Sequence, residues 1–238
     1  MEVLFISDIH VEFHKDKGKA FIEELPMADV VSIAGDLGNS KTMVASLTRF
    51  CQKYPKVIYV LGNHDCFSSF VKVNATLQDL KVQFPNLYWL ENERIVIDDQ
   101  AFIGCTLWYK PDDRRNDWVD FNYIYDSHLI EGKHFESVSY LRNNIQEGDI
   151  VITHMMPSYK CVSPRFIFSE WNNYFTNNLD DIIEITKPKI WHYGHTHDKA
   201  DFYLHNTRML CNPYGYKGRE IQINNFFNKN LILNTKGL

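Results

Sequence analysis

Five short polar motifs hold most of the side chains in this chain that bind metal ions best. In chain order they are Asp8-Ile9-His10, Gly35-Asp36, Gly62-Asn63-His64-Asp65, Thr153-His154 and Gly194-His195-Thr196-His197. Each follows a short apolar run, such as Val3–Ile6 or Ile190–Trp191, that predicts a buried β-strand. Carboxylate, carboxamide and imidazole ligands without thiolate suit manganese, iron or zinc. The motifs therefore predict a site for divalent cations.

The elements before these motifs predict a parallel sheet. We expect helices at residues 19–25, 42–52 and 70–84, with strands at 29–33 and 57–60 between them. This βαβ alternation gives parallel strands whose carboxyl ends share one edge of the sheet, where ligands bind. We expect the next strands, at 87–90, 94–97 and 101–106, to begin a second sheet.

The second half of the chain predicts further helices and strands. Helices are expected at 136–145 and 179–185, the latter with Asn177 or Asn178 as its N-cap. Strands are expected at 200–204, 208–211, 220–223 and 230–233. We expect an α/β fold, a four-layer α-β-β-α sandwich of two mixed sheets flanked by helices. It forms a single domain over residues 1–238, since no repeat or linker interrupts it.

Residues 108–134 follow no helical or strand period. Aromatic side chains such as Trp108 and Trp118 alternate there with charged ones such as Arg114 and Asp120. A long ordered loop of this kind is often functional. Two interpretations stay open: an inserted flap that faces the substrate, or a surface insertion with its own aromatic cluster. Residues 166–174 are a second candidate rim segment.

Composition limits the functional classes. The 238 residues carry a net charge of −5, so the chain has no basic field that would favour bulk nucleic-acid binding. The N-terminus starts directly with a strand-like run, which predicts neither a signal peptide nor a membrane span. Five scattered cysteines fit a reduced, cytoplasmic protein. Nothing in the sequence fixes the oligomeric state.

Taken in order, the five motifs resemble the signature of the calcineurin-like metallophosphoesterases, over about residues 1–225. The resemblance implies two divalent metal ions: manganese first, with iron, zinc, nickel and magnesium as alternatives. Asp36 would bridge them. The other implied ligands are Asp8, His10 and His197 for the first metal, and Asn63, His154 and His195 for the second.

The resemblance also implies a reaction. A metal-bridging hydroxide would attack the phosphorus of a phosphomonoester or phosphodiester, with His64 protonating the leaving oxygen as general acid. Asp65 would orient the His64 imidazole and raise its pKa. Residues 212–216 resemble an Asn-Pro-Arg-Gly-Tyr segment of a bacterial and phage branch, but Tyr214 stands in place of the arginine. Three arginines are candidates to compensate: Arg114, Arg115 and Arg165.

The substrate stays open at this stage. We expect a small phosphorylated molecule, with a nucleotide as one candidate, and no membrane partner. A protein phosphatase, a nuclease and a metal-bound interaction module without turnover are the alternatives. Retention of His64 argues against the last. Five histidines outside the motifs are expected to be surface or packing residues: His14, His128, His134, His192 and His205.

Overall fold

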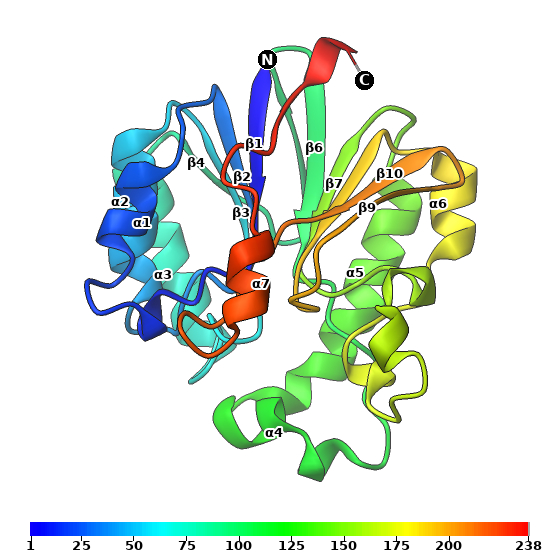
Figure 1. Ribbon diagram of the computed structural model, residues 1–238. Helices are drawn as coiled ribbons and strands as arrows, with labels where there is room; N and C mark the ends of the chain where they lie inside the picture. Colours follow the sequence, from blue (N-terminus) through cyan, green and yellow to red (C-terminus); the bar gives the residue numbers. More distant parts are fainter. Residues whose placement is uncertain (238) are drawn as a thin grey trace.

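The computed structural model describes residues 1–237 and shows two β-sheets packed face to face (Figure 1). The first sheet has the strand order β11-β1-β2-β3-β4. Strands β1 to β4 are parallel, and β11 pairs with β1 in the antiparallel direction. The bounds are β1 Glu2–Ile6, β2 Val30–Ala34, β3 Val57–Val60, β4 Leu87–Trp89 and β11 Ile232–Asn234.

The second sheet has the order β5-β6-β7-β8-β10-β9. Its four central strands are parallel, and β5 and β9 are antiparallel edges. The bounds are β5 Glu93–Ile97, β6 Gln100–Cys105, β7 Ile150–Thr153, β8 Ile190–Tyr193, β9 Ala200–Leu204 and β10 Thr207–Cys211. Strands β2, β3, β7 and β8 are buried along their whole length, as expected for parallel strands covered on both faces.

Helices cover the outer face of each sheet (Figure 1). The first sheet carries α1 (Lys19–Glu24), α2 (Met43–Lys53) and α3 (Phe70–Gln83), and the second carries α5 (Ile130–Asn144) and α6 (Asp180–Thr186). A separate apolar cluster, which includes Phe5 of β1 and Phe102 of β6, fills the space between the sheets. The expected four-layer α-β-β-α sandwich is therefore confirmed.

Two expectations from the sequence are wrong: the sheet to which β4 belongs, and a strand where the chain forms a helix. Strand β4 belongs to the first sheet, because α3 is a crossover that returns the chain parallel to β3, with Leu87 opposite Val57. The strand expected at 220–223 is wrong: residues Ile221–Phe226 form helix α7. That helix follows a turn closed by the Tyr216 amide, which donates to the Glu220 carboxylate at 2.7 Å.

Helix boundaries differ from expectation in two places. Helix α5 begins at Ile130, six residues before the expected start, so it takes in the end of the 108–134 segment. The N-cap of α6 is Leu179, without a capping side chain. The Asn177 side chain instead donates to the Leu107 carbonyl at 3.1 Å, which ties two loops together.

The parallel strands of the first sheet run toward the lower end of the molecule in Figure 1, where α4 (Val119–Tyr123) lies. Both chain termini lie at the opposite end. The loops that follow β1, β2, β3, β7 and β8 converge below the strands and bring the polar motifs together. In the described part of the chain, no helix is both long and apolar enough to cross a membrane.

Candidate metal centre

Three groups of potential metal ligands lie at the strand ends. One is His10, Glu12 and His64, and we call the other two, which share Asp36, the first and second clusters. The first cluster is Asp8, His10, Asp36 and His197, and the second cluster is Asp36, His154 and His195. Within each cluster the ligand atoms lie within 4.8 Å of one another. Asn63 adjoins the second cluster, because its Oδ1 is 3.1 Å from Nε2 of His154. The structure thus brings all seven predicted ligands together, and their binding of metal stays a prediction.

Tight turns after the strands direct these side chains inward. Asp8, His10, Asp36, His195 and His197 all have positive φ, between 48° and 67°. This left-handed conformation costs a non-glycine residue roughly 1–3 kcal/mol. Strain concentrated in five residues of one small region needs a compensating interaction, and ligand binding is the usual one at such positions.

Glycines let the turns approach one another closely. A Cβ on Gly62 would collide with the carboxylate and the backbone nitrogen of Asp36. A Cβ on Gly194 would lie 2.6 Å from the Ala34 carbonyl oxygen and 2.8 Å from Asp8 Oδ2. The glycines that open two of the motifs are therefore required by packing around the centre.

Two carboxylates fix the outer nitrogens of imidazoles in the first cluster. Nδ1 of His197 donates to Glu220 Oε2 at 2.8 Å, and Nδ1 of His10 faces Glu12 Oε1 at 3.3 Å. The proton is thereby assigned to Nδ1 and the Nε2 lone pair is left free, as in carboxylate–histidine–metal triads. The two inner nitrogens, Nε2 of His10 and Nε2 of His197, are 3.0 Å apart.

The donor set fits divalent cations. Nε2 of His195 and Oδ2 of Asp8 are buried and have no hydrogen-bond partner among the described residues. Nδ1 of His154 donates to the Ala34 carbonyl at 2.9 Å, which directs its Nε2 toward Asn63 and Asp36, the other predicted ligands on that side. Orphaned buried acceptors are costly, and cations between them would satisfy them.

The charges favour a cationic occupant. Burial alone would raise the pKa of Asp36, but nearby His154 and His64 hold it well below the usual range. Burial lowers the pKa of His154, and the Asp36 carboxylate more than offsets this and raises it to about 9. The Asp36 carboxylate is therefore ionised beside imidazoles, and a bound cation would take the place of the imidazole protons.

His64 lies beside the clusters and faces the cavity. Its Nδ1 is 3.3 Å from Glu12 Oε1, and its Nε2 is 3.3 Å from the hydroxyl of Tyr216. Burial lowers the pKa of His64, but Asp36 and Glu12 raise it to about 8. At neutral pH this imidazole is therefore mostly protonated.

The expected contact between Asp65 and His64 is wrong. The Asp65 carboxylate turns into the loops, where it accepts from the backbone amides of Asp36 (2.8 Å), Gly62 (2.8 Å) and Gly38 (3.1 Å). Asp65 thus holds the turns that carry Asp36 and Asn63. Glu12, on the short 3₁₀ turn after His10, takes the place beside His64.

Asp120 supports a predicted ligand from the 108–134 segment. Its buried carboxylate accepts from Asn63 Nδ2 at 2.9 Å, from the Tyr109 hydroxyl at 2.8 Å and from Trp118 Nε1 at 3.1 Å. The first bond turns the Asn63 amide so that its oxygen faces His154. Sequence reasoning missed this role, as it missed the contacts of Glu12 with His64 and of Glu220 with His197, because the residues in each pair are distant in sequence.

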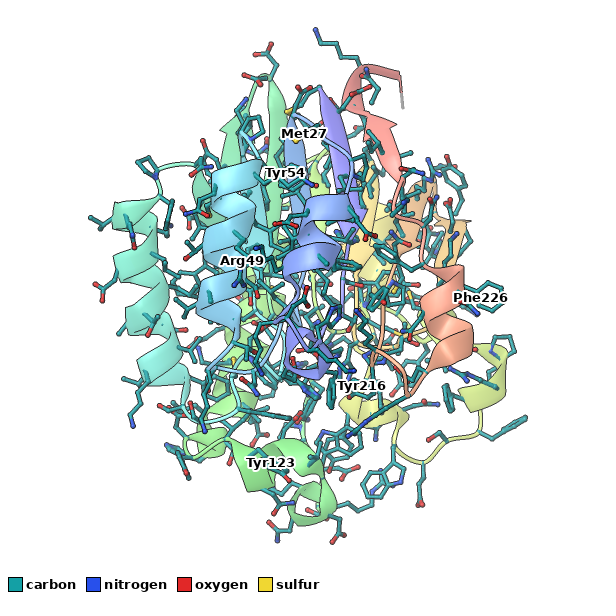
Figure 2. All side chains as sticks on the ribbon, turned by 60° about the vertical axis from the view of Figure 1, so that its left-hand side comes forward. Met27, Arg49, Tyr54, Tyr123, Tyr216 and Phe226 are labelled. Carbon is teal, nitrogen blue, oxygen red and sulfur yellow. The ribbon has the colours of Figure 1, made fainter. Side chains whose placement is uncertain are left out.

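A cavity of about 430 Å³ opens beside the centre. Asp36, Asn63, His64, His195 and His197 line its inner part. The outer part is lined by both candidate rim segments, through Trp118, Val119, Phe166, Ser169, Trp171 and Asn172. Figure 2 shows Tyr216, another lining residue, and Tyr123 of α4 at the same lower end of the molecule.

Of the three candidate arginines, Arg165 lines the cavity. Arg114 instead pairs with Asp112 at 2.6 Å, and Arg115 is exposed. Tyr214, at the position of the missing arginine, packs against Phe21 with ring centroids 4.7 Å apart. Tyr214 thus has a packing role.

The histidines outside the motifs have packing roles where they are buried. His14 bonds the Ile9 carbonyl at 3.2 Å, and His192 bonds the Ser32 hydroxyl at 2.9 Å between the sheets. All five cysteines are free and buried, and Cys66 belongs to the apolar core.

Comparison with known proteins agrees with this geometry. The calcineurin-like phosphoesterase family model matches residues 1–199. An uncharacterized protein of Acanthamoeba polyphaga mimivirus is 28% identical over 257 residues, covering 89% of this chain and 90% of that protein.

Two solved structures share the fold. The phosphopantetheinyl hydrolase PptH of Mycobacterium tuberculosis has a TM-score of 0.71 at 14% identity, over 92% of this chain and 91% of that one. The protein TT1561 of Thermus thermophilus has a TM-score of 0.55 at 12% identity, over 89% and 88% of the two chains.

Proposed function

Because this chain belongs to the calcineurin-like phosphoesterase family, we propose that it is a hydrolase that cleaves small phosphate esters with two divalent cations. The observation that carries the proposal is the position of Asp36. Its carboxylate belongs to both ligand clusters, so it is placed to bridge two ions.

The chain would hold one cation with Asp8, His10 and His197, and the other with Asn63, His154 and His195. When bound, two cations supply an activated water and neutralise charge on the phosphoryl oxygens. Oxygen and imidazole donors without thiolate favour manganese, with iron, zinc, nickel or magnesium as alternatives. The orphaned atoms of His195 and Asp8 support this assignment.

His64 would act on the leaving group. Glu12 accepts from its Nδ1, so the acidic proton available to a substrate is on Nε2, the atom next to Tyr216. Burial lowers the pKa of His64, and Asp36 and Glu12 raise it above its usual value, which favours this proton; bound cations would oppose that rise. General acid catalysis of this kind contributes about 10²–10⁴-fold.

The rim favours a small substrate over a macromolecule. Trp118 and Val119 line the cavity from one segment, and Phe166 and Trp171 line it from the other. PptH is a phosphopantetheinyl hydrolase by its title, and its shared fold is compatible with a small phosphoester. The net charge of −5 argues against a nuclease that binds long nucleic acids.

The test is hydrolysis of a substrate panel by protein with measured metal content. The panel holds alkyl and aryl phosphomonoesters, phosphodiesters, nucleotides, cyclic nucleotides, single-stranded DNA and phosphopeptides, with Mn²⁺ added. We expect two ions per chain and turnover of small esters that is abolished by chelation. Two bound ions without turnover of any member would indicate a non-catalytic metal-binding module. Preference for phosphopeptides or DNA would select one of the macromolecular alternatives.

A further inference from the structure

We infer that the outer part of the cavity is a binding site for an uncharged, apolar leaving group. The preferred substrate would then be the phosphate ester of an apolar alcohol, and this inference rests on the proposed function.

A continuous series of rings runs outward from the metal centre. The ring of His195, a predicted ligand, lies 4.5 Å from that of Phe175. Phe175 in turn lies 5.3 Å from Trp118, and Trp118 lies 5.6 Å from Trp171. All four residues line the cavity. We call Phe175, Trp118 and Trp171 the aromatic wall; it begins beside His195 and lines the same cavity as His64, the residue proposed to protonate the leaving oxygen.

The rest of this part of the cavity is mainly apolar, and its uncharged polar lining residues are Ser163, Ser169 and Asn172. Met156, Val162 and Phe166 line it together with the aromatic wall. Pockets for drug-sized ligands have volumes of roughly 300–1,000 Å³, and they are mostly apolar with a few polar anchors. The volume of about 430 Å³ thus leaves room for an organic group besides the phosphate.

The charged groups near the wall are already paired. Among the described residues that line the cavity, Arg165 is the single lysine or arginine. Its guanidinium forms two bonds with the Asp198 carboxylate, at 2.9 and 2.7 Å. The Glu220 carboxylate accepts from His197 and would repel an anion. A leaving group with further phosphates, such as a nucleoside diphosphate, would therefore find no free cation among the described residues that line this cavity.

The wall is held in place before substrate arrives. Trp118 donates from its indole nitrogen to Asp120, and its ring is stacked 4.9 Å from that of Tyr174. Tyr174 is buried and donates to Asp112 at 2.6 Å. A preformed apolar surface loses little conformational entropy on binding, so the burial of each substrate methylene can increase affinity.

The test compares methyl, butyl and hexyl phosphate with the manganese-loaded protein. We expect kcat/KM to rise at least about 10-fold from methyl to hexyl, because a single methylene in an apolar pocket is worth roughly 10-fold or more. Calorimetric titration with the non-hydrolysable methylphosphonate and hexylphosphonate should show the same order of affinity. A flat or falling series, or preference for nucleoside di- or triphosphates, would overturn the inference.

Two phenylalanines on the same loop provide a matched pair of variants. Phe166 lines the cavity, whereas Phe168 is 99% exposed. Phe166→Ser should lower the hexyl-to-methyl ratio of kcat/KM about 5-fold or more, and Phe168→Ser should leave it unchanged. Val162→Thr, which keeps side-chain shape, should lower the ratio in the same direction. Equal ratios in the Phe166 and Phe168 variants would contradict the assignment.

Different outcomes would contradict the apolar binding site and the proposed function. If the esters are hydrolysed without preference for the longer chain, the apolar site is wrong and the proposed function stands. If no ester of the wider substrate panel is hydrolysed but hexylphosphonate binds more tightly than methylphosphonate, the apolar site stands and the proposed function is wrong. If neither preference nor hydrolysis appears, both are wrong.

Discussion

The metal centre and the aromatic wall occupy one cavity but are built in opposite ways. The centre takes its side chains from turns at five strand ends, each held by glycines, backbone amides or carboxylates. The wall takes its side chains from loops and short 3₁₀ turns, and its rings are half-exposed. A reaction centre requires fixed geometry, whereas an apolar wall requires only the right surface. We infer that chemistry depends on the strand ends and selectivity on the loops.

The change with the largest expected effect is Asp36→Asn. It should lower metal affinity in both clusters at once, by more than the roughly 10–100-fold that an outer-shell partner contributes. The physical reason is that the shared carboxylate loses its charge. Metal analysis and calorimetry would measure it, and added Mn²⁺ should no longer raise the unfolding temperature.

Asp8→Asn is the control for that variant, since Asp8 belongs to the first cluster alone. It should weaken mainly one site. Full occupancy by two ions with normal turnover in Asp36→Asn would show that the two clusters do not share a bridge, and the contrast between centre and wall would lose its basis.

The second prediction concerns His64→Ala. Alkyl phosphates should slow by about 10²–10⁴-fold, and p-nitrophenyl phosphate much less, because its leaving group needs little protonation. Both ions should remain bound. Equal slowing of both esters would indicate that His64 binds phosphate, and loss of metal would make it a ligand.

The role proposed for His64 also predicts how kcat/KM depends on pH. A general acid works in its protonated form, so kcat/KM for alkyl esters should be retained at low pH and lost as pH rises through the pKa. That pKa is raised to about 8 by Asp36 and Glu12, against the effect of burial. Bound cations oppose the protonated form, so the falling limb should lie below 8 and be absent from His64→Ala.

The centre was predictable from sequence and its supports were not. Each predicted ligand follows its own strand within a few residues, so local pattern and the parallel-sheet rule place them together. Glu220 and Asp120 act through contacts with His197 and Asn63, which are distant in sequence, and Glu12 contacts the distant His64 as well as the nearby His10. Spacing in sequence carries no signal for such contacts.

The errors in fold and site have a similar cause. The sequence pattern predicts a strand at 220–223, whereas the chain forms α7 after a turn closed by Glu220. Asp65 follows His64 directly, yet the turn directs the two side chains to different partners. In both cases the geometry of a turn decides the local structure, and the pattern of apolar residues does not predict that geometry.

Glu12→Gln is the third prediction and tests the support behind the centre. Glu12 faces both His10 and His64, so the variant should weaken the first cluster by roughly 10-fold and lower the pKa of His64. The falling limb of the alkyl-ester pH profile should move to lower pH, and metal titration should show the loss of affinity. Asp65→Asn is the comparison variant. It should destabilise the fold, because the Asp65 carboxylate accepts hydrogen bonds from three backbone amides, and it should not shift the falling limb selectively. If Asp65→Asn moves the falling limb and Glu12→Gln does not, Asp65 is the partner of His64.

The last prediction concerns the residue that joins centre and wall. Asp120 accepts from Asn63 on one oxygen, and from Tyr109 and Trp118 on the other. In Asp120→Asn a single acceptor oxygen faces three donors, so either the Asn63 amide turns or the wall loses its anchor. Affinity of the second cluster for Mn²⁺ should fall about 10-fold, with the first cluster unchanged.

Tyr109→Phe, which removes a donor without touching Asn63, should lower the free energy of unfolding by about 1 kcal/mol and leave metal affinity intact. If Asp120→Asn alters only the preference for longer alkyl chains, Asp120 serves the wall alone, and the two regions are independent. If it alters both, the loop that selects the substrate also sets a metal ligand.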